Sequence, residues 1–313
     1  MKLLLTGGSG FLGSRVYEVA KTQGLEPRNV VRKPMLDDSA VIVAEINSQT
    51  DWSGAFEGID CVVHCAARVH QMNESAIEAL EAYREVNTLG TLNLARQAAQ
   101  AGVKRFIFIS SIKVNGEFSP SGYPFQPDLV HVPDDPYGLS KYEAEVQLRE
   151  LAKETGIEVV IIRPPLVYGP AVKANFLSMM RWVEKGIPLP LGAIHNSRSL
   201  VYIDNLVDLI LTCCKHPKAA GETFLVSDGK DVSTTHLLKA VALSMNKRAH
   251  LLPIPMSIID FSSKLIGKPQ ISQRLCGSLQ VDISHTRKIL DWEPPVTFEQ
   301  GMNRTVQAYL DSQ

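Results

Sequence analysis

The chain has 313 residues, of which 45% are hydrophobic, and its formal net charge is −1. This length allows one or two domains with a sizeable core, and the near-neutral charge gives no electrostatic footprint for nucleic acid. Gly7 interrupts the apolar N-terminal run, so no signal peptide is expected, and no apolar stretch is long enough for insertion into a membrane. The five cysteines lack metal-ligand spacing, which predicts reduced thiols packed in the core of a cytoplasmic protein and no metal site.

Three glycines follow the first apolar run, which predicts a buried strand over residues 2–6. Gly7 allows a tight turn, Gly10 lets the backbone approach a pyrophosphate, and Gly13 lets a helix pack against the strand. The helix predicted from Phe11 would offer unpaired N–H groups and a positive dipole end to phosphate. An ordinary strand-to-helix turn is the alternative, but strand, glycines and helix in this order favour dinucleotide binding.

Strand and helix patterns alternate up to about residue 165. Strands are predicted over 2–6, 28–32, 41–45, 60–65, 105–110 and 157–162, and helices over 11–23, 75–101 and 137–155. Strands that are apolar throughout and separated by helices are typical of an α/β fold, here a doubly wound parallel (Rossmann) sheet with helices on both faces.

The alternation of strand and helix patterns ends at a group of prolines that begins with Pro164. A strand over 199–203, a helix over 204–215 and a strand over 222–226 are predicted to return to the sheet, and helices over 233–246, 255–266 and 297–311 finish the chain. We therefore expect a dinucleotide-binding domain over 1–165 with a returning segment over about 200–227. A smaller, mostly helical substrate-binding domain would be assembled from 166–199 and 228–313.

Tyr137 and Lys141 are four residues apart in a predicted helix, so they share one face of it. A tyrosine hydroxyl ionises near about pH 10, and an ammonium beside it lowers that pKa. The pair therefore predicts a proton donor and acceptor for a carbonyl or an alcohol. Two exposed residues would give the same spacing, so the pair is informative only together with the glycine turn.

These features occur together with four further motifs, and in this order the sequence resembles the extended short-chain dehydrogenase/reductase superfamily, in its nucleotide-sugar epimerase, dehydratase and reductase branch. Within that branch it is most similar to a UDP-sugar subgroup that contains 4-epimerase-like proteins and the 4-keto reductases that form UDP-N-acetylquinovosamine. The motifs are Thr6–Gly13, Val63–Ala67, Asn87–Thr91, Phe108–Ser111, Tyr137–Lys141 and Arg163–Pro170.

The resemblance implies a catalytic role for each of three residues. Ser111 would hydrogen-bond the substrate carbonyl, Tyr137 would deliver the proton, and Lys141 would bind the nicotinamide ribose and tune Tyr137. A strand-end cap is the alternative for Ser111, and its position relative to Tyr137 favours the catalytic role.

The resemblance also implies a cofactor site and a substrate site. The cofactor site would consist of Gly7, Gly10, Phe11, Leu12, Gly13, Arg32, Lys33, Glu45, Ile46, Ala66, Ala67, Arg68, Asn87, Tyr137, Lys141 and Pro164. The substrate site, for a UDP-sugar, would consist of Ser111, Asn175, Phe176, Leu189, Leu191 and Arg198. Arg198 would clamp the diphosphate, for which a guanidinium is suited, and a surface ion pair is its alternative.

Arg32 and Lys33 stand where NAD-binding relatives carry an acid at the end of the second strand. A guanidinium and an ammonium suit a 2′-phosphate, so NADP(H) is the preferred cofactor and NAD(H) the alternative. A solvated basic loop would give the same residues.

Ile112 and Lys113 replace the acid pair that dehydratases of the superfamily use after this serine. Neither side chain suits the proton transfers of water elimination, so hydride transfer at C4 remains. We predict reduction of a UDP-4-keto-6-deoxy-N-acetylhexosamine in bacterial polysaccharide synthesis, with a UDP-sugar 4-epimerase as the alternative. A plant-like ketone reductase and a non-catalytic redox sensor are less favoured.

Two departures from the 4-epimerases concern the sugar pocket, since Leu166 replaces an asparagine and Asn115 a tyrosine. Arg274 is the candidate for a second arginine at the diphosphate. The resemblance also implies a homodimer through helices over 83–101 and 137–153, although Leu92 and Leu148 could instead face the sheet.

Overall fold

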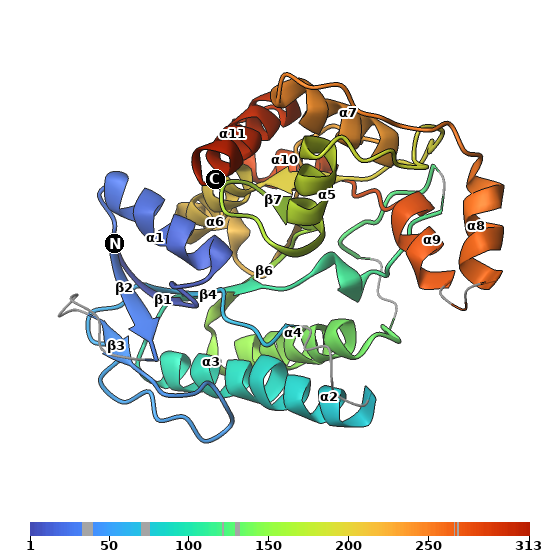
Figure 1. The fold of residues 1–313 in the computed structure, drawn as a ribbon. Coiled ribbons are helices and arrows are strands. Elements are labelled where there is room, and N and C mark those ends of the chain that lie inside the picture. Colours follow the sequence, from blue (N-terminus) through green and yellow to red (C-terminus); the bar gives the residue numbers. More distant parts are fainter. Residues whose placement is uncertain (33–39, 70–75, 121, 129–131, 266, 268) are drawn as a thin grey trace.

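The computed structural model describes residues 1–32, 40–69, 76–120, 122–128, 132–265, 267 and 269–313 (Figure 1). Within these residues a seven-stranded parallel sheet has the order β3-β2-β1-β4-β5-β6-β9, which confirms the predicted fold. Its strands are β1 (Lys2–Thr6), β2 (Glu26–Val31), β3 (Val41–Ile42), β4 (Cys61–His64), β5 (Arg105–Ile109), β6 (Glu158–Arg163) and β9 (Thr223–Leu225).

Helices cover both faces of this sheet (Figure 1). On one face lie α1 (Phe11–Thr22) and α6 (Ile203–Lys215), and on the other lie α2 (Ala76–Tyr83), the π-helical segment η1 (Arg84–Gly90), α3 (Thr91–Gln100) and α4 (Pro136–Thr155). A second lobe carries α5 (Ala174–Glu184), α7 (Thr234–Ser244), α8 (Met256–Leu265), α9 (Pro269–Cys276) and α11 (Phe298–Asp311). The chain also forms α10 (Ser284–Leu290), next to β9, and the short 3₁₀ segments η2 (Ile112–Val114) and η3 (Pro217–Ala219).

Alternate side chains of the central strands enter two different cores. Leu3 and Leu5 pack in the cluster that includes Val16 of α1 and Leu206 of α6. Leu4 packs in the other cluster, with residues of α3 and α4. Successive strand side chains point to opposite faces, and here both faces are buried, which explains why these strands are apolar throughout.

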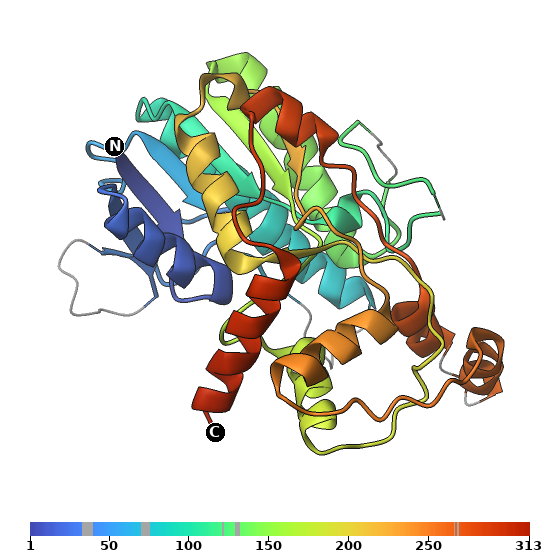
Figure 2. The ribbon, with the colours of Figure 1, turned by 90° about the horizontal axis from the view of Figure 1, so that it is seen from above.

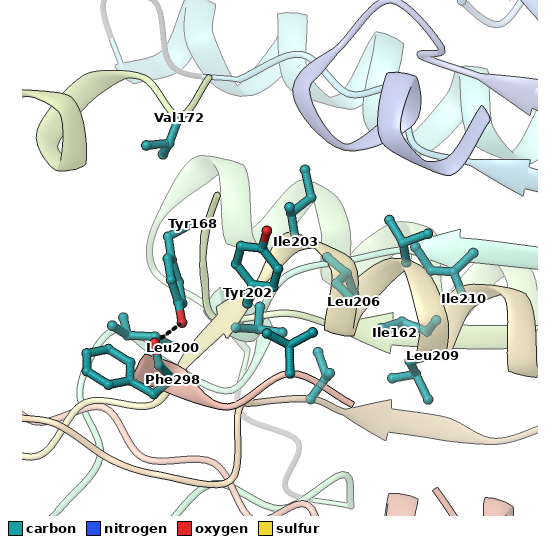
Figure 3. Packing of buried hydrophobic residues seen from close by; sticks show 14 of the residues in the cluster. Ile162, Tyr168, Val172, Leu200, Tyr202, Ile203, Leu206, Leu209, Ile210 and Phe298 are labelled. Atoms are coloured by element: carbon teal, nitrogen blue, oxygen red, sulfur yellow. Dashed lines mark hydrogen bonds between the residues drawn. The ribbon is translucent and has the colours of Figure 1, made fainter. Parts of the chain in front are cut away.

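One predicted strand does not join the main sheet. Strand β8 (Leu200–Tyr202) pairs in parallel with β7 (Leu166–Tyr168) as a separate sheet. Its Tyr202 packs beside Tyr168, and the Tyr168 hydroxyl donates to Phe298 O at 3.3 Å, so β8 belongs to the aromatic core around α11 (Figure 3). The rest of the returning segment behaves as predicted, because α6 covers the main sheet and β9 extends it beside β6.

The helix predicted over 75–101 is interrupted by η1 at Arg84–Gly90. Gly90 lies so close to the loop after β3 that a Cβ there would be 3.1 Å from Asn47 Cα, while the Asn87 side chain hydrogen-bonds to the Arg68 backbone. These contacts come from distant parts of the chain, so the local helical periodicity does not reveal them. Helices α9 and α10, which have eight and seven residues, were also not predicted.

A buried ion pair joins α4 to the end of β6. Arg163 contacts both carboxylate oxygens of Glu145, at 2.9 and 2.6 Å, and the two side chains are 1% and 0% exposed. Ser110 donates to the same carboxylate at 2.6 Å, and Arg163 also donates to Asn115 Oδ1 at 2.9 Å and to Pro127 O at 3.1 Å. The pair therefore connects the ends of β5 and β6, the following loop and α4.

We expect Arg163→Met to lower the free energy of unfolding by about 3–5 kcal/mol, because it leaves the Glu145 carboxylate buried without its main partner. The double variant Glu145→Gln/Arg163→Met should recover part of this loss, since no buried charge is left uncompensated. Urea denaturation measures both. Lys230→Met, which breaks the exposed Lys230–Glu299 pair, should cost less than about 1 kcal/mol. Additive losses in the double variant would contradict this account.

Candidate active site

The strand order reverses between β1 and β4, and the loops that follow these two strands meet there. Gly7, after β1, has φ +72°, and a Cβ on it would lie 2.8 Å from Ala66 N, after β4. A side chain is therefore excluded at this point by both the backbone angle and the contact. Ligands of open α/β sheets bind in the crevice at such a switch point, outside the carboxyl ends of the strands.

The glycine turn has the geometry of a phosphate cradle. Gly10 N donates to Gly7 O at 2.8 Å, and a Cβ on Gly13 would lie 2.1 Å from the same oxygen, so the turn packs tightly on the start of α1. Gly10 caps α1 without a side-chain hydrogen bond, so the N–H groups of its first turn, from Phe11 to Gly13, can bind phosphate.

Asn29, near the end of β2, supplies an acceptor beside this turn. Its Oδ1 atom is buried and has no hydrogen-bond partner among the described residues. A Cβ on Gly8 would lie 2.1 Å from that oxygen, so Asn29 directly abuts the turn. An unpartnered acceptor at the cradle fits a ligand that carries hydroxyl groups as well as phosphates.

His64 links the two strands below the cradle. Its Nδ1 lies 2.7 Å from Thr6 Oγ1 and its Nε2 lies 2.9 Å from Thr91 Oγ1, while Ala66 N donates to Thr6 Oγ1 at 3.3 Å. Burial, with a smaller contribution from the charge of Lys141, lowers the pKa of His64 to about 3. A neutral imidazole therefore holds β1, β4 and α3 together, and its role is structural.

Asn87 fixes the loop after β4. Its side chain accepts from Arg68 N at 2.8 Å and donates to Arg68 O at 3.1 Å, and it donates to Ser140 Oγ on α4 at 3.1 Å. The loop that carries Ala66, Ala67 and Arg68 is thereby tied to the helix that carries Tyr137 and Lys141.

Ser111 and Tyr137 lie on segments joined by Lys113. Ser111 follows β5, and its Oγ accepts from Lys113 N at 3.2 Å. The Lys113 ammonium lies 3.1 Å from Asp135, which caps α4 by accepting from Gly138 N at 2.7 Å. The ion pair thus sets the loop of Ser111 against the first turn of α4, where Tyr137 lies.

The structure contradicts the expectation that the pKa of Tyr137 is lowered. Burial, together with the negative charge of Asp135, raises the pKa of Tyr137 to about 12. Lys141 is buried, donates to Ile109 O at 2.9 Å and lies 4.5 Å from the centre of the Phe108 ring. Burial lowers the pKa of Lys141 to about 8, and its contacts with the strand end explain why it does not offset the burial of the phenol.

Three residues predicted to contact substrate have their side chains in the core instead. Phe176 of α5 is 1% exposed and stacks on Tyr168, with ring centres 5.6 Å apart. Leu189 and Leu191 are 9% and 4% exposed and belong to the same core. Any contact of these three residues with a ligand must come from the backbone, whereas Asn175 is exposed at the start of α5.

Arg198 is half-buried, and its guanidinium donates to Gly277 O, directly after α9, at 3.1 Å. Burial lowers the pKa of Arg198, but a guanidinium stays charged. The side chain of Arg274, the other diphosphate candidate, lies outside the described part of the chain, as does Lys33.

The remaining predicted cofactor residues lie at strand ends. Arg32 is exposed after β2, Glu45 is exposed and Ile46 half-buried after β3, and Pro164 O accepts from Ile112 N after β6. All of these ends lie at the carboxyl edge of the parallel sheet, as the prediction requires.

Two contributors to the site were not predicted from the sequence. Glu145 lies four residues after Lys141, which is the only sequence signal that places it near the site. Tyr83 packs edge-on against the Tyr137 ring, with centres 5.9 Å apart, and no pattern in the sequence indicates this contact.

Within the described residues, no group of three or more histidine, cysteine or acidic side chains could hold a metal ion. In the same part of the chain, no helix has the length and apolarity needed to cross a membrane.

Comparison with known families gives one match over most of the chain. The model of the NAD dependent epimerase/dehydratase family matches residues 3–227. The chain belongs to this family. It is therefore an enzyme of the extended short-chain dehydrogenase/reductase type, as the motifs indicated.

Members of the family resemble the chain over its full length. A UDP-glucose 4-epimerase of Vibrio cholerae is 52% identical over 314 residues, covering 99% of this chain and 96% of the relative. A crystal structure of UDP-glucuronic acid 4-epimerase from Bacillus cereus in complex with NAD has a TM-score of 0.78 at 22% identity and covers 100% and 99% of the two chains. RMD from Pseudomonas aeruginosa complexed with NADPH has a TM-score of 0.76 at 21% identity, with the same coverage.

The buried His64 gives this family member a testable pH dependence of stability. The unfolded imidazole binds a proton near about pH 6.5, whereas the folded one does so only near pH 3. The unfolded state therefore binds more protons between these values, so the free energy of unfolding should decrease by about 1.4 kcal/mol for each unit by which the pH is lowered, for this group.

Urea denaturation at several values between about pH 7 and pH 4 would measure this slope. His64→Asn should reduce it, and His195→Asn, at an exposed position, should leave it unchanged. Equal slopes for wild type and His64→Asn would show that the histidine does not remain neutral.

Proposed function

We propose that this protein is a nicotinamide-dependent UDP-sugar 4-epimerase. The observation that carries the proposal is the 52% identity to a UDP-glucose 4-epimerase over nearly the full length of both chains. The sequence favoured a 4-keto reductase and kept the epimerase as the alternative, and the similarity supports that alternative better.

The residues around the crevice fit a dinucleotide. The glycine turn and the start of α1 would hold the pyrophosphate, Asn29 would accept from a hydroxyl group, and Asn87 would keep the Arg68 loop in place. A nicotinamide held there would supply reversible hydride-transfer chemistry at C4 of the sugar. This chemistry requires a proton acceptor and donor for the C4 oxygen.

Ser111, Tyr137 and Lys141 would handle that proton. Ser111 would donate to the C4 oxygen, and Tyr137 would remove its proton and later return it. Lys141, with its pKa of about 8, is mostly charged at neutral pH. Its ammonium would bind the nicotinamide ribose beside Tyr137, the role that the family resemblance implies.

The UDP part would lie toward the second lobe. Arg198 would bind the diphosphate, and Asn175 at the exposed start of α5 would contribute polar contacts. The homodimer remains a prediction. Leu148 is fully buried in the core and cannot form its interface, whereas Leu89 and Val146, 41% and 39% exposed, lie on η1 and α4.

One observation favours a 4-keto reductase as the second candidate. Arg32, exposed after β2, suits the 2′-phosphate of NADPH, and an enzyme with net reduction draws on that reduced pool. Dehydration is disfavoured for both candidates, because Ile112 is buried and Lys113 is paired with Asp135 and Glu117.

Incubation with UDP-glucose and UDP-N-acetylglucosamine should yield the C4 epimer of at least one of them, without net change in NAD(P)H absorbance. Tyr137→Phe should lower kcat by about 10²–10⁴-fold and leave cofactor binding intact, because it removes the proton carrier and little volume. Tyr123→Phe, at a position 74% exposed, is the matched control and should keep full activity. Stoichiometric oxidation of NADPH by a UDP-4-keto-6-deoxy sugar, with no epimer formed, would instead establish the reductase.

We expect Arg32→Asp to weaken NADP(H) binding by about 10-fold or more, because it removes a charge-assisted hydrogen bond to the 2′-phosphate and adds a like charge. Binding of NAD(H) should change little. Isothermal titration with both cofactors measures the preference, and Arg96→Asp, on the exposed side of α3, is the control. A wild-type protein that binds NAD tenfold more tightly than NADP would contradict this role for Arg32.

A further inference from the structure

Helix α8 carries large apolar side chains on its exposed side, although its Ile259 packs against the core. Ile258, Phe261 and Leu265 are 52%, 69% and 77% exposed, whereas Ser263 is only 4% exposed. Residues at these spacings lie on one face of a helix. We call Ile258, Phe261 and Leu265 the α8 apolar stripe.

A hydrogen bond joins α8 to α9, and an exposed ion pair lies within α8. Asp260 accepts from Ser272 of α9 at 2.9 Å, and its carboxylate lies 2.7 Å from Lys264 on the next turn. Each residue of the stripe is more than half exposed. Contiguous exposed apolar side chains of this size mark an interaction surface.

The stripe lies at the outer edge of the molecule. Figures 1 and 2 both show α8 and α9 projecting from the second lobe, away from the main sheet. The neighbouring segment adds Leu252 and Met256, which are 49% and 36% exposed. The same hairpin reaches the candidate site, because Arg198 donates to Gly277 O directly after α9.

Charge distinguishes between the possible occupants of this surface. The segment 247–276 contains five basic residues and a single acidic one, although the whole chain has a net charge of −1. The basic residues are Lys247, Arg248, Lys264, Lys268 and Arg274, and the acidic one is Asp260. A short amphipathic helix with aromatic and aliphatic residues on one face and basic flanks is typical of binding in the plane of an anionic bilayer.

A second copy of the chain is a weaker candidate. A ten-residue helix is about 15 Å long, so one face of it offers only a few hundred Å² at most. Stable interfaces bury about 800 Å² on each partner. The stripe is large enough to insert into a headgroup layer but small for a dimer interface.

We propose that the α8 apolar stripe docks this protein on the surface of a membrane rich in anionic lipid. Phe261 and Leu265 enter the headgroup layer, and Lys264, whose side chain is 64% exposed on the same helix, contacts a lipid phosphate. Arg198 and the outer part of the candidate site are then close to the bilayer. The inference goes beyond the proposed function, because no step of the reaction depends on it.

Co-sedimentation with vesicles tests this directly. The full chain is mixed with sucrose-loaded vesicles of phosphatidylcholine and phosphatidylglycerol at about 70:30, and with vesicles of phosphatidylcholine alone. We expect binding to the anionic vesicles and at least fivefold weaker binding to the neutral ones. Phe261→Ser/Leu265→Ser should reduce binding to anionic vesicles at least fivefold, with an unchanged thermal melt.

Leu243→Ser is the matched control, because Leu243 on α7 is as exposed as Leu265, at 77%. It should bind vesicles like the wild type. Failure of the wild type to bind anionic vesicles would overturn the proposal, and so would equal binding to both vesicle types. A fall in molar mass of the double variant by light scattering, without vesicle binding by the wild type, would assign the stripe to a second copy. Since epimerisation is assayed separately, failure here leaves the proposed function standing.

Discussion

The site depends on the buried pair of Glu145 and Arg163. Two charges without solvent are tolerated only when their hydrogen bonds are satisfied, and here Ser110, Arg149, Asn115 and the Pro127 carbonyl supply further partners. Ser110 directly precedes Ser111, and Glu145 lies one turn beyond Lys141. A displacement of either charge would therefore move the strand end and the helix that carry the proposed catalytic residues.

The parts of the fold that the sequence predicted are those set by local pattern. The apolar runs of β1, β4 and β5 require cover on both faces, and the spacing of Gly7, Gly10 and Gly13 requires a turn at the switch point. Elements that depend on contacts between distant parts of the chain could not be predicted from the sequence. The π-helical segment follows from Asn87 and Gly90 meeting other loops, and β8 leaves the main sheet because Tyr202 packs with Tyr168 and Phe298.

In the candidate site, too, local patterns could be read from the sequence, whereas features that depend on the folded chain could not. The spacing of the glycines predicted the turn, and the family resemblance predicted Ser111, Tyr137 and Lys141 as a catalytic set, which stays a prediction. Motifs could not indicate the direction of a side chain: Phe176, Leu189 and Leu191 are buried, and their contact with substrate stays a prediction. The direction of the Tyr137 pKa shift could not be predicted from the sequence either, because it is determined by burial in the folded chain.

Lys113 cannot serve as the acid or base of a dehydratase, but it has a structural role in this chain. At a position where dehydratases need an acid or base, this chain has a cation that Asp135 and Glu117 both bind. That cation connects the Ser111 loop to the cap of α4, so it positions the proton-transfer residues without transferring a proton itself. The proposed proton-transfer set, Ser111, Tyr137 and Lys141, would serve an epimerase and a 4-keto reductase alike. The two proposed reactions would then differ in whether the cofactor leaves after each turnover, and Arg32, exposed after β2, is the residue that we predict to influence that step.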